Sequence, residues 1–228
     1  MVEFPSTNVT WIAMRMAEGE PGLIDIRRHI MERYAGPLAE YVRRSSLRTA
    51  GDADEIVNGY FVSTLAQDGY LERWLGTGVR LRRWVMNGLI LHAKGIVRDR
   101  LRETGRLSQP TDTLDMDHAA PESDAVRAFD QAWAHRLIEE ACSLAAERMA
   151  AEGRGRRFEL FRRHVLQGRR SADVASELGF RPQETSAVVR SATQAVRQAL
   201  RDLLAQDGVT ERELDQEYRE LRSLLESG

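Results

Sequence analysis

Apolar residues recur every three or four positions along almost the whole chain, the spacing of helices that bury one face. The first clear example includes Ile30, Tyr34 and Leu38. No segment shows the sustained alternation of apolar and polar residues that a half-buried strand requires. We therefore predict an all-α protein. Gly36 and Pro37 are expected to kink or divide this helix, because proline lacks an N–H and clashes with the preceding turn.

Further along the chain, a second helix is expected to start at Asp52, because Asp52 followed by Glu55 resembles a capping box. Residues 67–78 contain three glycines and are expected to be rich in turns. A long helix is expected from about Val79 to Leu101.

Residues 105–123 interrupt the helical pattern, since they hold Pro110 and Pro121, several aspartates and threonines, and few apolar side chains. This composition is typical of a flexible linker. We predict two small helical domains joined by it. The expected divisions are a loose N-terminal lead-in (1–22), a first domain (23–104), the linker (105–123), a second domain (124–206) and an acidic helical tail (207–228).

Charge is segregated along the chain, although the formal net charge is only −2. Between Arg154 and Arg170 there are seven arginines against one acidic residue, and a second basic block runs from Arg80 to Arg106. Acidic stretches at 112–130 and 202–226 offset these blocks. The basic blocks indicate nucleic-acid contacts or, equally, solvated helix faces.

Several classes of protein are disfavoured. Cys142 is the only cysteine, so no internal disulfide can form. No apolar run approaches the ~20 residues of a membrane span, and no signal peptide is recognisable, so a cytoplasmic protein is expected. The five histidines are scattered, and no glycine-rich phosphate loop is present. An enzyme is therefore the least favoured interpretation, and neither a cofactor nor a metal is expected.

The segment from Ser171 to Arg190 has the pattern of a helix-turn-helix. Ala175 is small where the second helix crosses, Gly179 permits a left-handed turn, and Pro182 suits the first turn of the second helix. A plain helical hairpin is the alternative. The small shared core is expected to consist of Val174, Leu178, Phe180 and Val188. The side chains expected to face a major groove are Gln183, Ser186, Ala187, Arg190, Ser191, Gln194 and Arg197.

Four motifs in order along the chain resemble those of bacterial sigma factors of the extracytoplasmic-function group. Residues 52–61 (DADEIVNGYF) and 81–85 (LRRWV) are similar to two helices of sigma region 2. Residues 129–134 (FDQAWA) and 158–161 (FELF), followed by the helix-turn-helix, are similar to region 4. The lead into region 4 and the acidic tail most resemble the sigma-like proteins of planctomycetes.

The resemblance implies a role for each domain. Region 2 binds the clamp helices of the largest subunit of core RNA polymerase and opens promoter DNA; region 4 reads promoter DNA and contacts the flap of the second-largest subunit. An anti-sigma factor is a further candidate partner. Carried over, the polymerase-binding residues are Asp54, Glu55 and Asn58. The DNA-binding residues of region 2 are Tyr70, Trp74, Arg82, Arg83, Asn87, Lys94 and Arg98. Trp84 is expected in the core, whereas Trp74 suits core packing and base stacking equally.

The chain also departs from the family pattern. Leu91 or a neighbour replaces the usual asparagine of region 2, Gly59 interrupts the signature helix, and Ser186 begins a stretch where the family often carries Lys or Arg. Two alternatives to a sigma factor therefore stay open: a polymerase-binding regulator with weak DNA binding, and a generic helix-turn-helix regulator.

The acidic tail could fold back on region 4, bind a partner, or restrain DNA binding electrostatically. Unchanged DNA affinity after deletion of the residues beyond Leu204 would exclude such autoinhibition.

Overall fold

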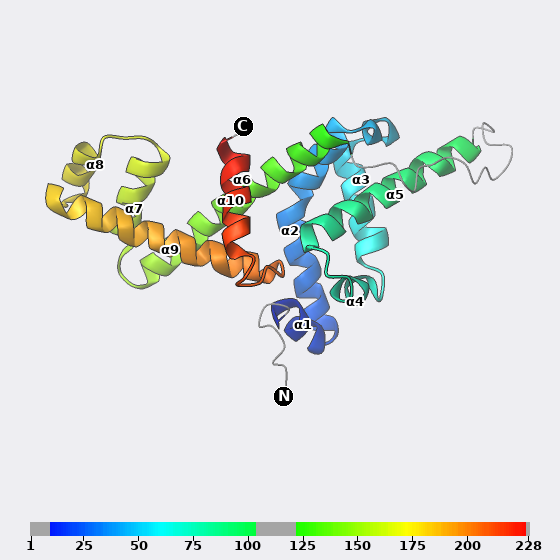
Figure 1. Ribbon diagram of the computed structural model, residues 1–228, viewed down its shortest axis with the longest axis horizontal. Coiled ribbons are helices and arrows are strands. Elements are labelled where there is room, and N and C mark those ends of the chain that lie inside the picture. Colours follow the sequence, from blue (N-terminus) through cyan, green and yellow to red (C-terminus); the bar gives the residue numbers. More distant parts are fainter. Residues whose placement is uncertain (1–9, 104–121, 227–228) are drawn as a thin grey trace. The chain divides into compact units, whose positions relative to one another are not determined.

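The computed structural model describes residues 10–103 and 122–226, and all of its regular elements are helices (Figure 1). The predicted all-α class is therefore confirmed for this part of the chain. The predicted linker lies outside the described residues except at its last two positions. Residues form two compact units: unit 1 comprises residues up to His135 together with those from Ala205 onward, and unit 2 comprises residues 136–204.

The first unit contains most of the helices. They are α1 (Thr10–Ala17), α2 (Glu20–Arg44), η1 (Ser46–Ala50), α3 (Ala53–Tyr60), the π-helical turn η2 (Phe61–Leu65), α4 (Tyr70–Leu75), α5 (Leu81–Glu103), the first part of α6 (Ser123–Ala151) and α10 (Leu214–Glu226). Helices α2, α3 and α5 pack against one another and form its core. Ile26, Tyr34, Tyr60 and Leu89 are fully buried between them.

The N-terminal stretch is more ordered than expected. Residues from Thr10 onward form α1 and the start of α2, whereas a loose lead-in was predicted up to residue 22. Gly22 lies directly against the backbone carbonyl of Arg15, where no side chain would fit, so this glycine lets α1 pack closely on α2.

Helix α2 runs without a break through Pro37, so the predicted division of this helix is wrong. Pro37, Leu38 and Tyr41 are all buried on its inner face. Tertiary packing on both sides of the proline outweighs the one backbone hydrogen bond that it removes.

Asp52 caps α3 as the sequence indicates: its carboxylate accepts hydrogen bonds from the backbone N–H groups of Asp54 (3.0 Å) and Glu55 (3.1 Å). The stretch predicted to be rich in turns contains the short helix α4. Gly69, at φ 76°, adopts the left-handed conformation that starts it.

Residues 124–135, which were expected in the second domain, pack in unit 1. Phe129 and Trp133 of α6 are buried there. Helix α10 of the acidic tail also belongs to unit 1, with Leu214 and Leu221 buried.

Unit 2 contains the rest of α6, α7 (Gly155–Phe161), the π-helical turn η4 (Arg162–Leu166), α8 (Ser171–Leu178), η5 (Pro182–Glu184) and α9 (Thr185–Gln206) up to Leu204. Leu160, Val174, Ala175 and Val188 form a buried cluster, against which Leu178 and Phe180 pack. Gly179 ends α8 at φ 73°, in the left-handed conformation expected of it. The shared core predicted for this segment is thus confirmed.

Candidate nucleic-acid interface

Helix α9 exposes the face that the sequence predicts. Of the seven predicted side chains, six are exposed: Gln183, Ser186, Ala187, Arg190, Gln194 and Arg197. Ser191 is half-buried, and its hydroxyl accepts a hydrogen bond of 3.2 Å from Arg154. On the opposite side of α9, Val188 and Ala192 are buried. The helix therefore has one face that packs on the core and one polar face that is open to solvent.

The arginine block before α8 divides into paired and unpaired groups. Arg162 and Arg163 bind Glu159, while Arg163 and Arg169 bind Glu177. Hydrogen bonds from Arg162 and Arg163 lower the pKa of Glu159 to about 2. Three other arginines of the block are exposed and have no ion pair within the described residues: Arg156, Arg157 and Arg170. Arg190 and Arg197 of α9 are likewise exposed and have no ion pair in the part of the chain that the structure describes.

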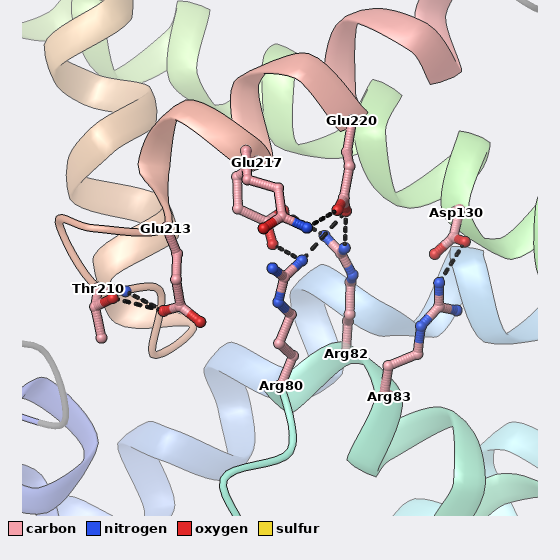
Figure 2. Close-up of polar contacts among 9 residues, drawn as sticks. Arg80, Arg82, Arg83, Asp130, Thr210, Glu213, Glu217 and Glu220 are labelled. Carbon is pink, nitrogen blue, oxygen red and sulfur yellow. Dashed lines mark hydrogen bonds and ion pairs between the residues drawn. The ribbon is translucent and has the colours of Figure 1, made fainter.

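Arg82 is buried, whereas the sequence predicts that it faces DNA. It is only 6% exposed, because its guanidinium stacks on Trp133, 4.4 Å from the ring centroid, and binds two carboxylates of α10. Its Nη1 lies 2.7 Å from Glu217 and its Nη2 lies 2.7 Å from Glu220 (Figure 2). Burial lowers the pKa of Arg82, but the charges and hydrogen bonds of Glu217, Asp130 and Glu220 together outweigh burial and raise that pKa overall. In this arrangement Arg82 is not an exposed DNA contact.

The other DNA-facing residues predicted on α5 differ in their availability. Arg83 is half-buried and binds Asp130 of α6 at 2.7 Å (Figure 2). Asn87 and Arg98 are exposed and Lys94 is half-buried, and none of the three has an ion pair in the part of the chain that the structure describes. The predicted DNA-facing side chains of α5 that remain available to a ligand therefore lie in its middle and toward its C-terminal end.

The two aromatic residues proposed for base stacking are both buried. The Tyr70 hydroxyl lies 2.7 Å from that of Tyr60, and burial raises the pKa of Tyr70 to about 12. Trp74 is 7% exposed and donates a hydrogen bond of 2.6 Å to the carbonyl of Val79. Neither aromatic ring offers an open stacking surface in this conformation.

Trp84, expected in the core, is half-buried and lines an open pocket of about 600 Å³ in unit 1. Its indole N–H has no hydrogen-bond partner within the described residues. The pocket is lined by Thr64, Tyr70, Arg73, Val79, Trp84, Asn87, Gly88, Leu91 and His92. Aromatic and aliphatic walls with one amide and one guanidinium suit a flat ring that carries polar edges.

Gly88, in the wall of this pocket, packs against two tyrosine hydroxyls that leave no room for a side chain. A methyl group there would meet the Tyr70 hydroxyl and lie 2.9 Å from the Tyr60 hydroxyl, whereas one at Gly95, on the same helix, would meet nothing within 4 Å. We expect Gly88→Ala to lower the free energy of unfolding by about 1–3 kcal/mol through overpacking. Gly95→Ala, the matched control, should raise it by up to about 1 kcal/mol through helix propensity. Urea denaturation measures both; equal effects would contradict the packing described here.

The predicted polymerase-binding residues Asp54, Glu55 and Asn58 are all exposed on α3. Asp54 forms an ion pair with Arg43 of α2 at 3.1 Å. Gly59 lies within α3 and faces His92: a methyl group there would be 3.2 Å from Nε2. The glycine therefore makes room for the imidazole of α5.

Sequence reasoning missed the residues that dock the C-terminal segment. Asp207 is 5% exposed and accepts hydrogen bonds from Arg33 (2.6 Å) and Tyr34 (2.8 Å), with His29 at 3.4 Å. Burial raises the pKa of Asp207, but the charge of Arg33 and these hydrogen bonds bring it down to about 2. Arg33, Tyr34 and His29 lie outside both basic blocks, so the charge pattern of the sequence did not indicate this contact.

Other kinds of site find no support in the described residues. No three His, Cys, Asp or Glu side chains gather there in a way that could hold a metal ion. None of the helices in residues 10–103 and 122–226 combines the length and apolar content needed to cross a membrane.

Comparisons with known proteins leave the chain without an assigned family: no family model, no curated protein and no solved structure matches it significantly.

Proposed function

We propose that the protein is a sigma-like transcription factor that binds core RNA polymerase and directs it to promoter DNA. The proposal rests above all on the geometry of α8 and α9. Their inner sides share one small core, while the outer side of α9 exposes five polar or small side chains, and η5 a sixth, Gln183, at the positions expected for a recognition helix. Unpaired arginines in the same unit supply the positive charge that phosphate contacts need.

Two features of unit 1 support the same proposal. The pocket beside Trp84 has the size and aromatic lining to take an unstacked base, an interaction of about 1–3 kcal/mol per base. The acidic residues of α3 form an exposed surface suited to a polymerase subunit.

Arg190 provides the test. Duplex DNA is first selected from a random pool with the full-length protein, and its affinity is then measured at several salt concentrations. Arg190→Gln should weaken binding of the selected sequence about 5- to 100-fold if Arg190 contacts a base. Arg162→Gln removes the same charge from the same unit, but Glu159 already occupies Arg162, so this control should change affinity much less. Equal losses would indicate a general charge effect, and no selected sequence would contradict sequence-specific binding.

One observation favours a second candidate, a polymerase-binding regulator with weak DNA binding. Arg82 and Arg83, two of the cations expected to contact promoter DNA, are engaged by Glu217 and Asp130. A protein fixed in this conformation would retain its polymerase surface but lose part of its DNA surface. The two candidates thus differ in whether these arginines can be released.

A further inference from the structure

Two carboxylates of α10, Glu217 and Glu220, bind two arginines, Arg80 just before α5 and Arg82 in its first turn. Figure 2 shows Arg80 and Arg82 pointing at Glu217 and Glu220. Arg82 binds both carboxylates at 2.7 Å, Arg80 binds Glu220 at 3.2 Å, and Arg80 also forms an ion pair with Glu217. Glu217 is completely buried, whereas the side chains of Arg80 (28% exposed) and Glu220 (37% exposed) remain partly open to solvent.

The carboxylates of Glu217 and Glu220 bind the guanidinium groups that the phosphates of a nucleic-acid backbone would bind. Guanidinium groups bind carboxylate and phosphate oxygens with the same planar set of N–H donors. Arg82 lies on α5 and Arg80 directly precedes it; the same helix carries Asn87, and also Lys94 and Arg98, which have no ion pair in the described residues. Removal of α10 would extend this polar surface to the start of α5.

The docked helix has the features of an element that can open locally. It has thirteen residues, and Leu214, Glu217 and Leu221 are its only buried side chains among the described residues. A helix of this length is marginal by itself, so its order depends on the docking contacts. Segments with few buried apolar contacts open at a lower free energy than the core around them.

We infer that α10 is an intramolecular competitor of nucleic acid: when docked it occupies Arg80 and Arg82, and a phosphodiester backbone displaces it. The inference rests on the proposed function, because it names DNA as the displacing polyanion. It adds that the C-terminal helix sets the apparent DNA affinity of the chain through the fraction of molecules in which α10 is released.

The test compares three full-length proteins: the unaltered chain, Glu217→Gln with Glu220→Gln, and the control Asp215→Asn with Glu226→Gln. Both variants lose two negative charges from α10, but Asp215 and Glu226 are exposed and touch neither arginine. The probe is a labelled DNA duplex with a single-stranded overhang, titrated at several salt concentrations. The Glu217/Glu220 variant should bind it about 10-fold more tightly than the unaltered chain. The control should differ from the unaltered chain by less than about 2-fold, because exposed charges are screened by salt.

A second readout needs no variant and so does not depend on how well a variant folds. Hydrogen exchange of the α10 amides is measured in the unaltered chain with and without the DNA probe. Faster exchange in the presence of DNA is expected. If DNA binds equally well to all three proteins and α10 stays protected, the competition is refuted while the proposed function stands. If none of the three proteins binds DNA, the proposed function fails and the inference fails with it.

Discussion

Replacing Arg82 with methionine is expected to weaken the docking of α10 by about 3 kcal/mol, because it leaves the buried carboxylate of Glu217 with Arg80 as its one ion-pair partner among the described residues. Glu217 has no solvent contact, and Arg82 also loses its contact with the face of Trp133. The measurement is hydrogen exchange of the α10 amides, which reports the free energy of local opening.

Two further variants make this result specific. Arg98→Met, on the same helix, changes an exposed side chain without an ion pair in the described residues, and should alter the opening free energy by no more than about 0.5 kcal/mol. Adding Glu217→Met to Arg82→Met should recover much of the loss, because an apolar pair of similar volume avoids the uncompensated charge. An unchanged opening free energy in Arg82→Met would show that the ion pairs do not hold α10.

The second large effect is expected at Asp207. Asp207→Asn removes the charge that faces Arg33, which is 1% exposed, and should lower the free energy of unfolding by about 3 kcal/mol at pH 7. Asp215→Asn, an exposed aspartate of α10, is the control and should have little effect. Urea denaturation of the three proteins gives the comparison.

The same carboxylate predicts a pH dependence. The pKa of Asp207 is lowered to about 2 in the folded protein, below that of an unfolded aspartate. Its stabilisation is therefore fully present above about pH 4 and is lost as the pH falls through 2. The difference between the unaltered chain and Asp207→Asn should shrink by about 2 kcal/mol across this range. A constant difference would mean that the charge of Asp207 is not what stabilises the contact.

Features that depend on a few neighbouring residues were predictable from the sequence. The cap at Asp52, the left-handed turn at Gly179 and the exposed face of α9 each follow from spacing within one or two turns of helix. In these places local preference and tertiary packing agree, so the pattern alone is sufficient.

Features that depend on remote parts of the chain were not predictable. Arg82 carries a charge and was expected at the surface, but its burial depends on Trp133 and on Glu217, which lie far from it in the sequence. Trp74, for which the sequence left core packing and base stacking equally open, is buried in α4, whereas Trp84, expected in the core, is half-buried beside a pocket. The helical period identifies a face that can be buried, but it does not identify the element that covers it.

The most direct test of the proposed function is to mix the purified full-length protein with bacterial core RNA polymerase. Co-elution is measured first, and initiation from a pool of candidate promoters is measured next. We expect the protein to co-elute with the polymerase and to direct initiation at defined sites. A folded protein that does not co-elute with core polymerase would contradict the proposal, and the exposed face of α9 would then need another explanation.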